Sequence, residues 1–329
     1  MNQNATLTTF SHPALASQSW FIDSDTAGVQ LYLRNRRRTH IEAFGSERTV
    51  MLMHAATYAG DSLFDVAHGE TGSFMDFLAM RGYDVYSVDV RGYGGSTRPP
   101  EMMAPSDASP PTVSTETAIS DLSRAISHVI ERNGLSQLNL IGMSWGGTVA
   151  GAYAARVPEH VHKLGLIAPQ WIDSRSVSID TGGELGAYRT VSREAARERW
   201  LGAVPDEQRE ALVPRELVEK WEQITFGADD ANPYHVPNGV VQDRRDYWAA
   251  GRAYYDPGEI TAPTLLIHGE WDRDVPLDTN QAYFRRLTGA AYKRWIEIGQ
   301  TTHMLILERQ RHQAFDGIAA FLDEVLTEN

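Results

Sequence analysis

Residues 139–151 read NLIGMSWGGTVAG, and this stretch decides how the rest of the chain is interpreted. The apolar run that ends at Gly142 has the length of a strand, and the stretch from Trp145 onward has the spacing of a helix. Ser144 stands between them, and Gly146 follows it. A G-x-S-x-G sequence between a strand and a helix predicts a sharp turn that holds the serine hydroxyl clear of the sheet. The alternative is an ordinary junction in which the glycines serve packing alone.

Strand-like and helix-like stretches alternate on both sides of this turn. Apolar runs typical of strands lie at 19–24, 29–36, 49–56, the start of 84–96, 138–142, 162–169, 264–269 and 293–299. Helical spacing is found at 73–82, 114–134, 145–159, 278–288 and 310–326. Strands that alternate with helices indicate a mostly parallel sheet covered by helices, so the predicted fold class is α/β.

The alternation stops after residue 170. SREAARERWLGAV, PRELVEKWEQITF and VVQDRRDYWAAGRAYY have helical spacing, and no convincing strand is found before about residue 258. The predicted organisation is therefore a core from 1–170 and 259–329, interrupted by a helical insertion over 171–258.

The bulk composition restricts the class of protein. A net charge of −13 disfavours a nucleic-acid or anionic-membrane partner, because such proteins usually present a basic face. The absence of cysteine excludes disulfides, thiolate catalysis and cysteine metal sites. The first 20 residues lack the pattern of a signal peptide, and no apolar run approaches the roughly 20 residues that span a bilayer. The expected location is the cytoplasm.

A serine hydroxyl needs a base to become a nucleophile, and the base needs an orienting acid. Asp272 follows the predicted strand 264–269, and His303 follows the predicted strand 293–299. Both lie just past the carboxyl ends of strands, where open α/β sheets bind their ligands. The order Ser144, Asp272, His303 therefore predicts a catalytic triad. Asp274 is a second candidate for the acid.

The chain resembles the α/β-hydrolase superfamily, in particular capped serine hydrolases such as esterases and carbon–carbon bond hydrolases. The resemblance rests on HAATYAG after the third strand, DVRGYGGS after the fourth, GMSWGG, GEWDRDVP and the late histidine. It covers about residues 29–170 and 259–326, and it implies an α/β-hydrolase fold with a cap inserted after strand six. It selects Asp272 over Asp274 through its G-x-x-D turn, and Asp173 is a further option that some relatives use.

The oxyanion of a tetrahedral intermediate needs hydrogen-bond donors. The backbone N–H of Trp145, directly after the nucleophile, is one candidate. The resemblance implies a second donor two positions after a histidine, which is Ala56 in His54-Ala55-Ala56. Here Ala55 replaces the glycine that is common in the family. His54 is expected to brace this loop, and the glycines of RGYGGS are expected to shape a turn. No cofactor and no metal site are predicted.

The insertion is rich in tryptophan and tyrosine, which is typical of the core of a small helical domain. Its candidate substrate-pocket residues are Trp171, Tyr188, Arg189 and Trp248. Arg189 is the one cation that is proposed to meet an anionic substrate group. Arg193, Arg197 and Arg199 share a predicted helix with glutamates, and are expected to form a solvated face with local ion pairs.

The predicted function is cleavage of a carboxylic ester or lactone of a fairly bulky, apolar small molecule through an acyl-enzyme. A carbon–carbon bond hydrolase of a ring-cleavage dienoate and an acyltransferase would use the same triad, so both stay open. A ligand-binding receptor on the same fold is the non-enzymatic alternative. Dehalogenase and ordinary epoxide-hydrolase chemistry is disfavoured, because those relatives place aspartate at the position of Ser144. The oligomeric state is open, and a homodimer is one option.

Overall fold

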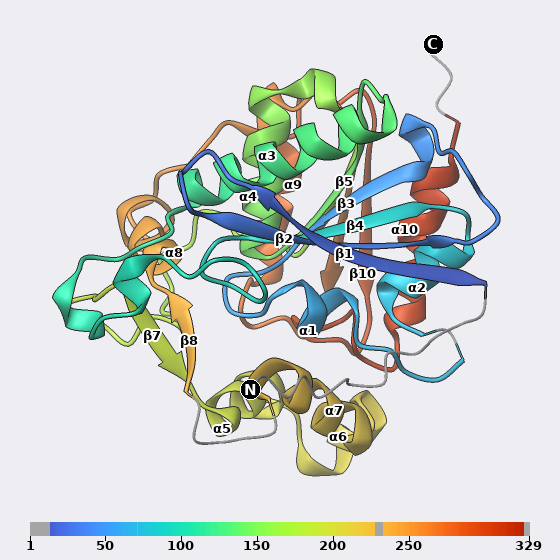
Figure 1. The fold of residues 1–329 in the computed structure, drawn as a ribbon. Helices are drawn as coiled ribbons and strands as arrows, with labels where there is room; N and C mark the ends of the chain where they lie inside the picture. Colours follow the sequence, from blue (N-terminus) through green and yellow to red (C-terminus); the bar gives the residue numbers. More distant parts are fainter. Residues whose placement is uncertain (1–13, 71, 228–232, 326–329) are drawn as a thin grey trace, which may run out of the picture.

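The computed structural model describes residues 14–70, 72–227 and 233–325. An eight-stranded sheet with the order β1-β2-β4-β3-β5-β6-β9-β10 forms its centre (Figure 1). The strands are β1 (Leu15–Asp23), β2 (Gln30–Arg38), β3 (Thr49–Met53), β4 (Asp84–Asp89), β5 (Leu138–Met143), β6 (Val161–Ile167), β9 (Thr264–Gly269) and β10 (Lys293–Ile298). The pairings of β2 with β1 and with β4 are antiparallel, and the remaining pairings are parallel. The predicted α/β class is confirmed.

Helices cover both faces of the sheet. Figure 1 shows α3, α4 and α9 on one side and α2 and α10 on the other. Their bounds are α2 (Phe74–Met80), α3 (Thr115–Asn133), α4 (Trp145–Arg156), α9 (Leu277–Arg286) and α10 (Arg311–Asp323), and the short α1 (Gly60–Phe64) follows β3. Neighbouring residues of β3 alternate between two apolar cores, with Met51 in one and Leu52 in the other. This period of two is expected of a strand that is buried on both faces.

Local signals fix the ends of the core helices. Ser73 and Asp76 form a capping box at the start of α2, because each side chain accepts the other residue's backbone N–H. The predicted helix over 114–134 is observed as α3, where Ser114 caps the first turn and Gly134 ends the helix with φ +65°. The last predicted helix is observed up to Asp323. Its expected final residue, 326, and residues 1–13 of the signal-peptide prediction lie outside the described residues.

The segment between β6 and β9 is not wholly helical, which corrects the sequence prediction. It contains the helices α5 (Arg193–Leu201), α6 (Asp206–Leu212), α7 (Arg215–Phe226) and α8 (Gly239–Asp243), followed by a π-helical turn (Arg244–Trp248). It also contains an antiparallel pair of four-residue strands, β7 (Tyr188–Val191) and β8 (Tyr234–Pro237). Strands this short give little period-two signal, and their pairing joins positions far apart in the sequence. The domain boundaries at 170/171 and 258/259 stay predictions.

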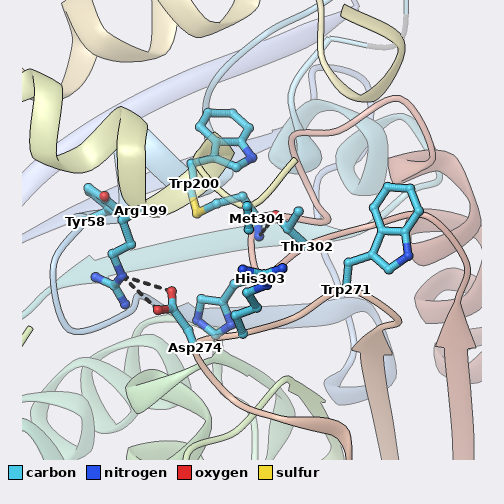
Figure 2. Close-up of a pocket in the computed structure, with 10 residues that line it drawn as sticks. Tyr58, Arg199, Trp200, Trp271, Asp274, Thr302, His303 and Met304 are labelled. Carbon is cyan, nitrogen blue, oxygen red and sulfur yellow. Dashed lines mark hydrogen bonds and ion pairs between the residues drawn. The ribbon is translucent and has the colours of Figure 1, made fainter. Parts of the chain in front are cut away.

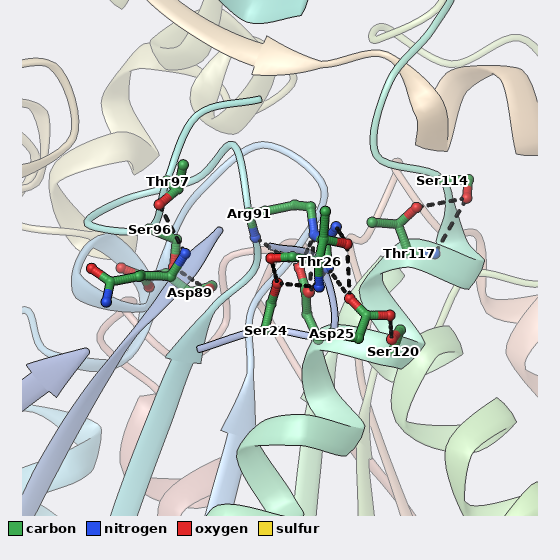
Figure 3. A network of polar contacts seen from close by, with 12 residues as sticks. Ser24, Asp25, Thr26, Asp89, Arg91, Ser96, Thr97, Ser114, Thr117 and Ser120 are labelled. Carbon is green, nitrogen blue, oxygen red and sulfur yellow. Dashed lines mark hydrogen bonds and ion pairs between the residues drawn. The ribbon is translucent and has the colours of Figure 1, made fainter. Parts of the chain in front are cut away.

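The glycine-rich stretch after β4 forms a turn, as predicted. Gly92 and Gly94 have φ values of +83° and +47°, which glycine adopts at little cost. Arg91 anchors the turn, since its guanidinium contacts Asp121 of α3 at 2.5 Å and Asp25 of the β1–β2 connection at 2.7 Å (Figure 3). This network ties the loop at the carboxyl end of β4 to two other elements.

No helix of the described residues is both long enough and apolar enough to span a bilayer.

Candidate active site

Ser144 lies on a strained turn between β5 and α4. Its backbone has φ +58° and ψ −122°, a conformation that residues with a Cβ atom rarely adopt. The turn is held by hydrogen bonds, because the Ser144 N–H donates to the Ile167 carbonyl at 2.8 Å and the Ser144 carbonyl accepts from Gly147 N–H at 2.9 Å. Strain of this kind persists only where the surroundings impose it, and it is typical of functional sites.

Both glycines around Ser144 are required by close backbone contacts. A Cβ atom at Gly142 would lie 2.2 Å from the Gly146 carbonyl oxygen. A Cβ atom at Gly146 would lie 2.2 Å from the His54 carbonyl oxygen. Because the opposing atoms belong to the backbone, they cannot move aside as a flexible side chain would. Close packing of the turn therefore requires glycine at both positions, and the catalytic role of the turn stays a prediction.

Asp272 and His303 meet at the same end of the sheet. Asp272 lies on the loop after β9 and His303 on the loop after β10, and these two strands are parallel neighbours. The Nδ1 atom of His303 lies 2.7 Å from Asp272 Oδ2. The other carboxylate oxygen of Asp272 accepts the backbone N–H groups of Asp274 and Val275, each at 2.9 Å. These contacts fix the carboxylate, and through it the imidazole.

Of the three aspartates considered for the acid, Asp272 makes the hydrogen bond to His303. Asp274 instead forms an ion pair with Arg199, with its two oxygens 2.9 and 3.1 Å from the guanidinium Nε. Asp173 is bound by Arg175, whose Nε lies 2.7 Å from Asp173 Oδ1. The geometry favours Asp272 for the acid.

The surroundings of His303 suit a base. Burial by itself lowers the pKa of His303, but the charge and hydrogen bond of Asp272 and the charge of Asp274 raise that pKa above its usual value. Its Nε2 atom is buried and has no hydrogen-bond partner among the described residues. No hydrogen bond between Nε2 and the hydroxyl of Ser144 is found there either, so that contact stays a prediction. Catalytic hydrogen bonds often tighten only when the substrate binds.

Two backbone N–H groups, one on the Ser144 turn and one on the loop after β3, make no hydrogen bond within the described residues. The N–H of Trp145, at the first position of α4, and the N–H of Ala56, on the loop after β3, have no acceptor among the described residues. His54 fixes this loop, because its Nδ1 lies 2.8 Å from the Ala55 carbonyl and its Nε2 accepts Val90 N–H at 3.0 Å. Burial lowers the pKa of His54, which favours the neutral ring that this pattern needs.

Three of the four predicted pocket residues have structural contacts of their own. Trp171 packs edge-on against Tyr283, and Trp248 is fully buried. The hydroxyl of Tyr188 donates to the Ala104 carbonyl at 3.0 Å. Their part in a substrate pocket stays a prediction.

Arg189 differs from these three because it is a cation with no acidic partner in the part of the chain that the structure describes. Its guanidinium donates to the carbonyls of Pro237 at 2.6 Å and Ala56 at 3.0 Å, and to the hydroxyl of Thr57 at 3.1 Å. No carboxylate of the described residues forms an ion pair with it, and its Nε is buried without a partner there. Burial lowers the pKa of Arg189 to about 10, so the group is still charged at neutral pH. Arg189 therefore places beside the loop of Ala56 a positive charge that no carboxylate of the described residues pairs with.

Arg199 is a residue whose role the sequence prediction missed. It was expected on a solvated face, but it turns inward to the ion pair with Asp274 and donates to the Thr57 hydroxyl at 3.1 Å. Arg197 on the same helix follows the prediction in part, because its side chain is exposed but its ion pair is with Glu222 of α7. Arg193 donates to the Gly227 carbonyl. Ion pairs between distant segments leave no periodic signal in the sequence.

A small pocket opens beside His303, between α5 and the core loops (Figure 2). Its volume of about 30 Å³ is enough to admit water. Arg199 and Asp274 form one wall, and Trp200 and Trp271 form others. No group of three histidine, aspartate or glutamate side chains that could hold a metal ion is found within residues 14–70, 72–227 and 233–325.

Comparisons with known proteins agree with this fold. A 2-hydroxy-6-oxononadienedioate/2-hydroxy-6-oxononatrienedioate hydrolase from Pseudomonas sp is 27% identical over 243 residues, which cover 73% of this chain and 77% of the relative. Human protein ABHD8 is 26% identical over 286 residues, which cover 84% of this chain and only 57% of ABHD8.

Solved structures with a similar fold are also found. The enol-lactonase from Burkholderia xenovorans LB400 superposes with a TM-score of 0.60 at 17% sequence identity, over 92% of this chain and 100% of that one. At that identity the likeness shows the fold alone. A sequence model described as the alpha/beta hydrolase fold matches residues 59–310, which is most of the chain. The protein therefore belongs to the alpha/beta hydrolase fold family of hydrolases.

Proposed function

We propose that the protein is a serine hydrolase that cleaves a carboxylic ester or lactone of a fairly bulky, apolar small molecule. The observation that carries the proposal is the hydrogen bond between Asp272 and His303, with the far nitrogen of the imidazole left without a partner among the described residues. The strained turn at Ser144 supplies the nucleophile at the same edge of the sheet.

In the proposed reaction, Ser144 Oγ attacks the substrate carbonyl while its proton passes to His303 Nε2. Asp272 holds the imidazole in the required tautomer and stabilises its charged form. The N–H groups of Trp145 and Ala56 donate to the oxyanion, and each such donor typically lowers the barrier by about 3 kcal/mol. His303 returns the proton to the leaving alcohol. His303 then takes a proton from a water molecule, which attacks the acyl carbonyl, and that proton passes to Ser144 Oγ as the acid product leaves.

The test is covalent labelling with a phosphonate ester probe. Ser144 is expected to carry the phosphonyl group, as identified by mass spectrometry of the labelled peptide. The Ser144→Ala variant is expected to remain unlabelled, which controls for reaction at other hydroxyls. Intact wild-type protein that is not labelled would overturn the proposal and would favour the ligand-binding receptor.

A second candidate function is carbon–carbon bond hydrolysis of a dienoate, and Arg189 is the observation that favours it. A dienoate carries a carboxylate, and Arg189 is a cation that no described carboxylate neutralises. The name of the Pseudomonas relative also describes a dioic acid substrate. The same triad residues would serve this reaction, so the substrate distinguishes the two candidates.

Matched substrates separate these candidates. The panel comprises p-nitrophenyl esters of graded chain length with and without a terminal carboxylate, a lactone and a dienoate. For a dienoate hydrolase, Arg189→Met should raise KM for the carboxylate substrates and leave KM for the neutral esters unchanged, while Arg189→Lys should restore part of the affinity. If Arg189→Met leaves KM for the carboxylate substrates unchanged, the ester and lactone function is favoured. Product analysis with an added alcohol acceptor tests acyl transfer.

A further inference from the structure

Two consecutive residues of α5 contact the loops that carry Asp272 and His303. Arg199 pairs with Asp274, two residues after Asp272, at 2.9 Å (Figure 2). Trp200 donates its indole N–H to Glu308 Oε1 at 2.9 Å. The helix α5 lies in the insertion between β6 and β9, so both contacts join that insertion to the core.

Glu308 carries the second contact to the histidine loop. Its carboxylate accepts the backbone N–H of Thr302 at 2.8 Å and also the hydroxyl of Thr302. Thr302 directly precedes His303. Glu308 is fully buried. A single carboxylate therefore joins Trp200 to the backbone that sets the position of the imidazole.

The first contact controls charge near the imidazole. Asp274 lines the small pocket together with His303, and Arg199 lies against Asp274 on the same wall. The negative charge of Asp274 raises the pKa of His303, and the positive charge of Arg199 lowers it. Within the described residues, the titratable and charged groups that face His303 or its loop are Asp272, Arg273 and Asp274 after β9, Arg199 on α5, Tyr58 after β3, His268 on β9 and Glu308 after β10.

We propose that α5 is a positioning element for the base: Arg199 neutralises Asp274 beside His303, and Trp200 fixes the histidine loop through Glu308. The inference rests on the proposed role of His303. It follows that movement of α5 away from the core would disturb the position and the charge of the base together. The segment between β6 and β9 would then influence catalysis through the base.

The experiment compares charge variants on the two sides of the ion pair. Arg199→Met removes a positive charge, so the acid limb of the pH profile of kcat/KM should move to higher pH. Asp274→Asn removes a negative charge, so the same limb should move to lower pH. Arg199→Lys keeps the charge and should restore the wild-type limb. Arg197→Met is the matched control on the same helix, because Arg197 pairs with Glu222 inside the insertion; its limb should not move.

The titration of the His303 imidazole, followed by NMR in a Ser144→Ala background, gives a readout that does not need turnover. Opposite shifts in the Arg199→Met and Asp274→Asn proteins would support the inference even if the proposed reaction proved wrong. The inference would be overturned if the imidazole pKa shifted in the same direction in both proteins, or if Arg197→Met shifted it as much as Arg199→Met. The labelling of Ser144 tests the proposed function independently of these shifts. If Arg199→Met does not fold, Arg199→Gln removes the same charge and should shift the imidazole titration to higher pH; an unshifted titration in that protein would overturn the inference.

Discussion

The turn at Ser144 and the loops of Asp272 and His303 are held in place by different kinds of contact. Around Ser144 the close contacts are made by backbone atoms, including the carbonyls of His54 and Gly146. Around His303 they are made by side chains, among which Trp200 reaches the loop from 108 positions away through Glu308. The first region therefore tolerates no added atom, whereas the second depends on charge and hydrogen bonding between distant segments.

Because of this difference, the two regions should respond differently to added side-chain volume, to pH and to the loss of a charge. A backbone-built turn responds to added volume and is indifferent to pH, because peptide groups do not titrate. A loop held by carboxylates responds to pH and to the loss of single charges. Substitutions in the two regions can therefore test whether the comparison is correct.

Removal of the nucleophile should have the largest effect. Ser144→Ala should lower kcat by about 10⁶-fold, which is the order of loss seen when a serine hydrolase loses its nucleophile. The variant should fold normally, because alanine is no larger than serine. Turnover of a p-nitrophenyl ester and a thermal unfolding curve check both statements. A rate within tenfold of the wild type would mean that the turn has no catalytic role.

A single methyl group in the turn should have the next largest effect. In Gly146→Ala the new Cβ would lie 2.2 Å from the His54 carbonyl oxygen, so the backbone must shift. We expect a loss of about 1–3 kcal/mol in the free energy of unfolding and about 100-fold in kcat, because the hydroxyl is displaced. Gly299→Ala is the control, since its Cβ would meet only Glu270 Oε2 at 3.6 Å. If Gly146→Ala and Gly299→Ala lost equal amounts of unfolding free energy and of kcat, the turn at Ser144 would not be crowded.

The backbone-built region was the part that could be predicted from the sequence. The strand, the two glycines and Ser144 are contiguous, so their pattern is visible in a dozen residues. The predicted helix over 114–134 was similarly confirmed, because its end signal, Gly134, lies beside the helix itself. When the residues that determine a local structure are neighbours in the chain, the sequence pattern alone predicts that structure.

The side-chain-built region could be predicted only in part. Asp272 and His303 were found through their place after two strands, and the structure joins them by a hydrogen bond. The inward turn of Arg199 was missed, because its partner Asp274 lies 75 positions away and the helical pattern suggested a solvated face. The strands β7 and β8 were missed for the same reason, since neither four-residue strand is stable without the other.

The effect expected at Glu308 is on stability alone, with no change in kcat predicted, and it distinguishes the two regions by pH. Burial raises the pKa of Glu308 to about 7, from 4.5 for an exposed glutamate. The raised pKa means that between pH 4.5 and 7 the unfolded chain releases the proton while the folded protein keeps it. Folding stability from this group is thus fully present below pH 4.5, falls as pH rises, and is lost above about pH 7.

The measurable quantity is the difference in unfolding free energy between wild type and Glu308→Gln, which cannot titrate. At 1.36 kcal/mol for each pH unit, wild type should lose about 3 kcal/mol relative to the variant between pH 4.5 and pH 7. Urea unfolding at several pH values measures this, with Glu207→Gln on the exposed surface of α6 as the control. A difference that stays constant with pH would show that Glu308 keeps its usual pKa, and the expected pH sensitivity of the side-chain-built region would then be wrong at this residue.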